Sequence, residues 1–252
     1  KTKAIMLPHI YGFPNDMNKI MSICNNYGLY LIEDSSEMIG QKFNNIPCGS
    51  FGDISTFSFY ANKHITTGEG GMILTDNLKL AEKCKSLRNI YFNDVRRFKH
   101  FELGWNSRFT NLQAAVGLAQ LEKIKYFVSI KRKIGALYQK NIVSNKNFNK
   151  PQTIFKNSKN IYWVYGIVLK NKFKNKLQFI KKKLHKNNIE TRDFFYPLHK
   201  QPILNKLGLF KNERYPNAEY ISKNGFYIPS GLGMTKKEQL NVIKVINKVL
   251  EN

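Results

Sequence analysis

The sequence predicts an α/β protein, with a mixed, mostly parallel sheet in residues 1–130 and a small α+β domain in residues 131–252. Two features predict this fold class. In the first part, short apolar runs flank a helical repeat of apolar residues, as is typical of strands buried on both faces of a parallel sheet. Beyond residue 125 the composition changes, and the Asn- and Lys-rich residues 144–159 are expected to form loop and linker.

The first elements predict a strand–helix–strand unit. Residues 4–7 form an apolar run, residues 17–24 have the apolar spacing of a helix with one buried face, and residues 29–32 form a second apolar run. Asp34 follows this second run closely. In parallel sheets ligands gather beyond the carboxyl ends of the strands, so Asp34 lies where a functional carboxylate is expected.

The next segment predicts two more strands, at residues 54–60 and 72–75, with Lys63 in the connection between them. The glycine-rich residues 67–71 predict a loop immediately before the later strand. A helix is then expected to begin after residue 77 and to end near Arg88.

The remaining helices are marked by their first turns. Thr110 and Gln113 form a capping-box pattern, and the helix that they begin is expected to continue past Leu121. Thr235 and Glu238 form the same pattern before the last helix. Between them we expect a strand at residues 161–169 and a basic helix at residues 174–187.

The chain is strongly basic, with 41 Lys and Arg against 17 Asp and Glu and a formal charge of +24. Such a charge is compatible with nucleic acid, but the lysines are scattered through Asn-rich surface segments and form no recognised nucleic-acid motif. We therefore expect phosphorylated small molecules as partners, with a basic nucleic-acid-binding protein as the alternative.

Several other classes are not signalled. Cys24, Cys48 and Cys84 are odd in number and widely spaced, and the five histidines lack a metal-ligand spacing, so neither disulfides nor a metal site are expected. The sequence has no apolar run of transmembrane length and does not begin with a signal-peptide pattern, which favours a cytoplasmic protein without membrane association.

Asp34, Lys63 and the loop Gly68–Gly71 together match the requirements of pyridoxal-phosphate chemistry. That chemistry needs a lysine amine for the aldehyde, a carboxylate that keeps the pyridine nitrogen protonated, and small hydrogen-bond donors around the phosphate. Burial would also lower the proton affinity of the lysine and make its neutral amine available.

These motifs, in this order and at this spacing, resemble the sugar aminotransferases of the DegT/DnrJ/EryC/StrS family. Segments near residues 190–200 are most similar to its sugar 4-aminotransferases. The segments that carry the resemblance are Glu33–Glu37, Gly49–Asp53, Phe57–Phe59, Asn62-Lys63, Thr66–Met72, Gly104–Arg108, Asn111–Ala115, Gly117–Leu121, Glu190–Arg192, Phe195–His199 and Pro229–Gly231.

The resemblance implies fold type I of the pyridoxal-phosphate-dependent transferases, the aspartate-aminotransferase-like fold, with a truncated large domain. It implies that Lys63 forms the Schiff base with pyridoxal 5'-phosphate and that Asp34 pairs with the pyridinium nitrogen. Glu37 would lie near the ring hydroxyl and Ser58 would contact the phosphate. Asn106, supplied by the neighbouring subunit, would complete the phosphate site, so a homodimer is implied.

For the substrates, the resemblance implies a two-stage reaction. Glutamate donates an amino group to the cofactor, which passes it to a 4-keto-6-deoxy sugar on a nucleoside diphosphate, and Lys63 moves the proton in both stages. Thr191, Arg192, Phe195 and His199 are placed on the sugar-nucleotide side of the site. The product would enter a surface polysaccharide.

Other interpretations stay open at this point. Lys63 could be a surface lysine, Asp34 a strand-end carboxylate, Ser58 a serine bonded to backbone, and Asn106 part of a turn. A related sugar dehydratase would carry a histidine where this chain has Lys63. Family members also have residues ahead of the position of Lys1 that carry a phosphate turn and a ring-stacking aromatic residue. The chain is thus expected to be cut from a longer enzyme or to be an inactive remnant.

Overall fold

The computed structural model describes residues 1–92, 96 and 98–251. Two compact units divide the chain. The first unit comprises residues 1–129 and 153–163, and the second comprises residues 130–152 and 164–252. The predicted division into residues 1–130 and 131–252 stays a prediction, and residues 153–163 lie in the first compact unit.

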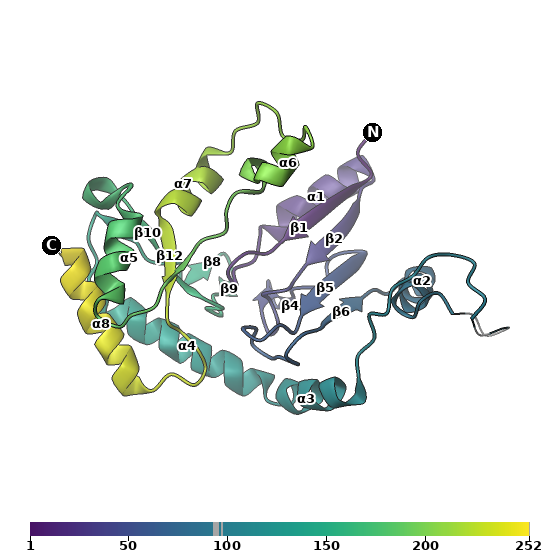
Figure 1. The fold of residues 1–252 in the computed structure, drawn as a ribbon, viewed down its shortest axis with the longest axis horizontal. Helices are drawn as coiled ribbons and strands as arrows, with labels where there is room; N and C mark the ends of the chain where they lie inside the picture. Colours follow the sequence, from purple (N-terminus) through teal and green to yellow (C-terminus); the bar gives the residue numbers. More distant parts are fainter. Residues whose placement is uncertain (93–95, 97, 252) are drawn as a thin grey trace. The chain divides into compact units, whose positions relative to one another are not determined.

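The first unit is built on a four-stranded sheet with the order β1-β2-β5-β6 (Figure 1). Strands β1 (Ala4–Pro8), β2 (Tyr30–Asp34) and β5 (Ile54–Ser58) are parallel, and β6 (Gly71–Leu74) pairs with β5 in the antiparallel sense. The predicted mixed, mostly parallel sheet is therefore confirmed.

One helix and a small core support this sheet. Helix α1 (Met17–Tyr27) connects β1 to β2 and ends at Gly28, whose φ of 60° is left-handed and lets its N–H bond the carbonyl of Cys24. Buried side chains of α1, β2 and the following segments form the core of the unit: Met17, Cys24, Leu31, Met38, Phe43 and Cys48.

Two short hairpins and three helices complete the first unit. The hairpins are β3 (Lys42–Phe43) with β4 (Ile46–Pro47), and β8 (Ile154–Phe155) with β9 (Ser158–Lys159), the latter lying inside the predicted linker. The helices are α2 (Leu78–Arg88), α3 (Asn111–Leu121) and the first part of α4 (Ile124–Asn141). Thr110 and Gln113 make both bonds of the predicted capping box, but α3 ends at Leu121 and does not continue as one helix.

The second unit contains an antiparallel sheet with the order β11-β12-β10-β7. Its strands are β7 (Phe148–Asn149), β10 (Tyr165–Leu169), β11 (Arg192–Asp193) and β12 (Gly225–Ile228). Its helices are the rest of α4, η1 (Asn171–Phe173), α5 (Leu177–His185), η2 (Leu198–Lys200), α6 (Pro202–Lys206), α7 (Pro216–Asn224) and α8 (Lys236–Glu251). The predicted α+β character of this part is thus observed.

Candidate active site

The candidate site of the first unit lies where its parallel strands end. Asp34 is the last residue of β2, and Ser58 is the last residue of β5. Lys63 follows in the connection from β5 to β6, where its N–H bonds the carbonyl of Tyr60. Because parallel strands end at one edge of a sheet, the fold brings these segments to the place where such sheets bind ligands.

The Lys63 amine is enclosed by a carboxylate and an indole ring. Its Nζ lies 3.9 Å from Oε1 of Glu37, and only 11% of the Lys63 side chain and 7% of the Glu37 side chain are exposed. The same Nζ lies 4.3 Å from the ring centroid of Trp163. Burial lowers the pKa of Lys63, against the opposing effects of Glu37 and Asp34. The amine is therefore closer to its neutral, nucleophilic form than an exposed lysine would be.

Burial also acts on the Glu37 carboxyl. It raises the pKa of Glu37 to about 7, although the N–H of Tyr11 donates a hydrogen bond to this carboxyl and the Lys63 charge favours its ionised form. The charge of Asp34 adds to the increase in the pKa of Glu37. The site therefore contains an amine with a lowered pKa beside a carboxyl whose pKa is about 7.

Asp34 uses one carboxylate oxygen to fix its own orientation. Its Oδ1 accepts hydrogen bonds from the N–H of Ser36 at 3.1 Å and from the Ser36 hydroxyl at 2.5 Å. Within the described part of the chain, its Oδ2 has no hydrogen-bond partner. A half-buried, oriented carboxylate with one available oxygen can hold a protonated ring nitrogen, which is the role predicted for Asp34.

The loop near Ser58 offers hydroxyl and backbone groups. The Ser58 hydroxyl accepts a hydrogen bond from the N–H of Tyr60 at 3.3 Å, as the backbone-bonding alternative expects. The Thr66 hydroxyl donates to the carbonyl of Phe59 and accepts from the N–H of Gly68, both at 2.9 Å. These contacts order the connection from β5 to β6, and the phosphate role of Ser58 stays a prediction.

Asn106 belongs to a different part of the first unit. It pairs with Asn89 in an isolated antiparallel bridge, and its Oδ1 accepts a hydrogen bond from Nε of Arg108 at 3.0 Å. Among the described residues, no hydrogen bond or ion pair joins Asn106 to Lys63 or Asp34. Its contribution to a neighbouring subunit stays a prediction.

The four residues predicted for the sugar nucleotide lie in the second unit. Arg192 begins β11 and is exposed, Thr191 precedes it, and the Phe195 side chain is 50% exposed. His199 in η2 is buried, and its Nε2 lies 2.9 Å from Oε1 of Glu219. Their roles toward a substrate stay predictions.

Two aromatic residues of the site were not predicted. Tyr11 lies three residues beyond the end of β1, and its ring stacks on that of Trp163 with centroids 6.3 Å apart. The indole N–H of Trp163 donates to the carbonyl of Asn62 at 3.1 Å and so holds the backbone of the residue before Lys63. The position of Tyr11 at a strand end was a usable signal, whereas no spacing rule connects residue 163 to residue 63.

Neither a metal site nor a membrane-spanning helix is found among residues 1–92, 96 and 98–251. No group of three or more His, Cys, Asp or Glu side chains in these residues could hold a metal ion. No helix formed by them is long and apolar enough to cross a membrane.

A buried lysine amine beside acidic side chains at the carboxyl edge of a mostly parallel sheet is typical of α/β enzymes that use a lysine amine in catalysis. Residues 1–247 match the DegT/DnrJ/EryC1/StrS aminotransferase family, and the chain belongs to this family. The predicted family resemblance is therefore confirmed.

Two of the relatives are GDP-perosamine synthases. GDP-perosamine synthase of Escherichia coli O157:H7 is 37% identical over 249 residues, which are 98% of this chain and 66% of that protein. GDP-perosamine synthase of Vibrio cholerae is 37% identical over 250 residues, 97% of this chain and 66% of that protein. The chain thus spans just under two thirds of the length of these relatives.

Two solved structures are similar over nearly the whole chain. PseC of Helicobacter pylori, an aminotransferase involved in the biosynthesis of pseudoaminic acid, has a TM-score of 0.93 and 26% identity, covering 99% of this chain and 67% of PseC. A mutant of the GDP-4-keto-6-deoxymannose-3-dehydratase ColD with bound GDP-perosamine has a TM-score of 0.83 and 25% identity. The match covers 97% of this chain and 68% of ColD. The predicted aminotransferase-like fold is confirmed.

Proposed function

We propose that this chain carries the cofactor lysine of a pyridoxal-phosphate-dependent aminotransferase that moves an amino group from glutamate to a 4-keto-6-deoxy sugar on a nucleotide. One observation carries the proposal. The amine of Lys63 is buried between Glu37 and Trp163 at the carboxyl edge of the sheet, and burial lowers its pKa. Membership of an aminotransferase family supports the same chemistry.

The residues of the site fit this cofactor. Pyridoxal phosphate, when bound, supplies an aldehyde for the lysine and substrate amines and a ring that accepts electrons. The unpartnered Oδ2 of Asp34 is available to keep the ring nitrogen protonated, within the part of the chain that the structure describes. Glu37 would bond the ring hydroxyl, and Ser58 and the N–H groups near Gly68 would face the phosphate.

Lys63 has a second role in the proposal, as the proton carrier. With the cofactor bound, the neutral amine of Lys63 would accept a proton from the substrate carbon and release it again, and it would do so for both substrates. The lowered pKa of Lys63 favours its neutral amine, and the nearby Glu37 carboxyl has a pKa of about 7.

For the acceptor, the names of the relatives support a perosamine-synthase-like reaction on a GDP-linked sugar. Thr191, Arg192, Phe195 and His199 are the residues proposed for the sugar-nucleotide side. The product would serve surface polysaccharide such as O-antigen. Three free cysteines and a nucleotide-linked substrate favour the cytoplasm, a reducing compartment, as the site of the reaction.

The sugar dehydratase is the second candidate, because the similarity to ColD covers 97% of this chain. Lys63 favours the aminotransferase, because the family resemblance implies a histidine at this position in the dehydratases.

We also propose that the active form is a homodimer that shares its sites. The segment around Asn106 supports this proposal, because it presents large apolar side chains to solvent. Leu103 is 89% exposed, Trp105 is 65% exposed and Leu112 is 82% exposed. Exposed apolar surface of this kind marks an association site. Sedimentation of the chain tests the proposal, and a monomer at all concentrations would contradict it.

The central experiment is an absorbance titration of the purified chain with pyridoxal phosphate. We expect a Schiff-base band that disappears when glutamate is added. Lys63→Ala should remove the band, and Lys42→Ala, which changes an exposed lysine of β3, should keep it. A folded chain without the band, or a band that survives Lys63→Ala, would refute the assignment of Lys63.

A further inference from the structure

Glu33 is a fully buried carboxylate to which the proposed chemistry assigns no task. It lies in β2 directly before Asp34, and its side chain has no exposed surface. Burial of a carboxylate is costly unless donors replace its water. The donors here are Nε2 of His9 at 2.9 Å, the Ser35 hydroxyl at 3.3 Å, and the backbone N–H groups of Gly49, Phe51 and Gly52.

These donors keep Glu33 ionised. Burial alone would raise the pKa of Glu33, but the hydrogen bonds from His9 and from the N–H groups of Gly49 and Phe51 outweigh it. The net result is a pKa of Glu33 below the ordinary value for glutamate. The carboxylate is therefore a fixed negative charge beside the candidate site.

The hydrogen bonds of His9 also determine its tautomer. The backbone N–H of Asn15 lies 3.1 Å from Nδ1 of His9, and a backbone N–H can only donate. Nδ1 is therefore the acceptor, and the proton resides on Nε2, which donates to Glu33. His9 is thus oriented as a donor to Glu33 and as an acceptor from Asn15.

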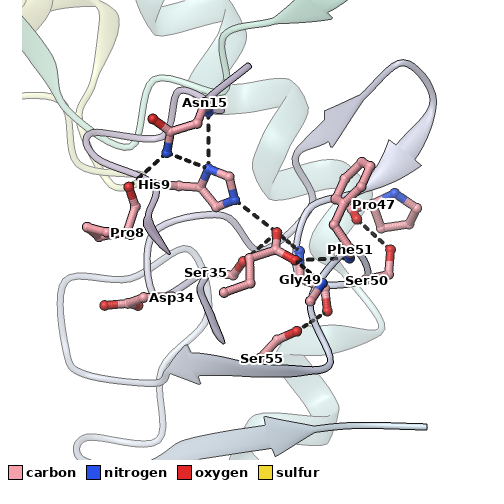
Figure 2. A network of polar contacts seen from close by, with 12 residues as sticks. Pro8, His9, Asn15, Asp34, Ser35, Pro47, Gly49, Ser50, Phe51 and Ser55 are labelled. Atoms are coloured by element: carbon pink, nitrogen blue, oxygen red, sulfur yellow. Dashed lines mark hydrogen bonds and ion pairs between the residues drawn. The ribbon is translucent and has the colours of Figure 1, made fainter. Parts of the chain in front are cut away.

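His9 and Glu33 are both bonded to the segment that carries Asp34. The backbone N–H of His9 donates to the carbonyl of Asp34 at 3.0 Å. Ser35, the next residue, donates its hydroxyl to Glu33 and its N–H to the carbonyl of Thr56 at 2.9 Å. Figure 2 shows His9 between Asn15 and the turn that carries Gly49, with the Asp34 side chain directed away from the network.

We propose that His9 and Glu33 are positioning residues that hold the Asp34 carboxylate in the orientation required by the pyridine end of the cofactor. The inference rests on the proposed function. The Glu33 carboxylate holds Ser35, the residue that follows Asp34, and the backbone of the turn at Gly49, while Nε2 of His9 holds that carboxylate in place. A pair that served only the stability of the fold would leave cofactor affinity unchanged in the folded protein.

The test compares the affinity of folded variants for pyridoxal phosphate, measured by quenching of intrinsic fluorescence. His9→Ala is expected to weaken binding about tenfold, as is usual when a partner that orients a ligand-binding group is lost. His9→Gln keeps an amide that can donate to Glu33 and should restore most of the affinity. Cys24→Ser disturbs the buried core of the same unit and should lower stability without changing affinity.

A second measurement does not use the cofactor. Nitrogen NMR of the cofactor-free chain is expected to show His9 protonated on Nε2 alone, and a proton on Nδ1 would overturn the assigned geometry. If His9→Ala does not fold, His9→Asn, with a shorter amide, takes its place in the affinity measurement.

The possible outcomes separate the two proposals. A wild-type chain that binds the cofactor, together with a His9→Ala or His9→Asn variant that binds it equally well, would overturn the positioning role and leave the proposed function intact. A folded wild-type chain that binds no pyridoxal phosphate would overturn both. Weaker binding in the alanine variant that the glutamine variant repairs is the result that supports the inference.

Discussion

Replacing Lys131 by methionine should remove most of the pH dependence of stability of the second unit above neutral pH. Lys131 lies in α4 and is 5% exposed. Its amine donates to the backbone carbonyl of Ser230 and lies 3.4 Å from the Ser230 hydroxyl. Burial lowers the pKa of Lys131 from 10.5 to about 7.

The sign of the effect follows from proton binding. Between the folded pKa of about 7 and the unfolded value of 10.5, the unfolded chain binds a proton at Lys131 that the folded chain does not hold. The free energy of unfolding therefore rises with pH between these two pKa values. With about 1.4 kcal/mol for each pKa unit, the rise amounts to roughly 2 kcal/mol between about pH 7 and about pH 9.

Urea unfolding at several pH values within this window measures the effect. The unfolding free energy of the wild type minus that of Lys131→Met should increase by roughly 2 kcal/mol as the pH rises, because only the wild type gains stability at this site. Lys133→Met, which changes an exposed lysine of the same helix, should follow the wild type. A constant difference between wild type and Lys131→Met at all pH values would refute the reasoning.

Three further substitutions test other parts of the structure. Gly49 has a φ of +94°, and a Cβ there would lie 2.1 Å from the Phe57 ring, so Gly49→Ala should lower the thermal midpoint, whereas Gly231→Ala, with open space around it, should not. Leu184 is fully buried in α5, and Leu184→Ala should cost about 2–5 kcal/mol in urea unfolding; a loss below ~1 kcal/mol would contradict the core assignment. Burial raises the pKa of Glu37 from 4.5 to about 7, so the folded chain holds a proton that the unfolded chain releases. Wild-type stability should therefore fall between about pH 5 and about pH 7, and Glu37→Gln should lack this fall in melting experiments.

Local elements of the fold could be predicted because they depend on neighbouring residues. Thr110 and Gln113 form the capping box that begins α3, and Thr235 and Glu238 exchange the same bonds before α8. The strand–helix–strand unit of β1, α1 and β2 follows from apolar spacing, and the placement of Asp34 at the end of β2 follows from it. Each signal is complete within a few residues.

The lengths of some elements could not be predicted from these local patterns. The predicted strand at residues 161–169 is shortened to β10 at Tyr165–Leu169, and residues 161–163 belong to the first unit. The side chains of residues 161–163 are buried in that unit, but these residues do not pair in a sheet. An apolar run indicates burial, but it does not specify which partner buries it.

Motif order and short-range spacing are enough to predict the family, the order of the four main strands and of helices α1 to α3 in the first unit, and Lys63 as the amine of interest; the hairpins β3–β4 and β8–β9 were not predicted. Only the tertiary structure showed that Trp163 lies over Lys63, that Glu37 lies beside its amine, and that His9 donates to Glu33. These contacts join residues far apart in the chain or on separate strands. These contacts form only when the folded backbone brings the residues together. The burial that shifts the pKa values of Lys63 and Glu37 depends on the same packing.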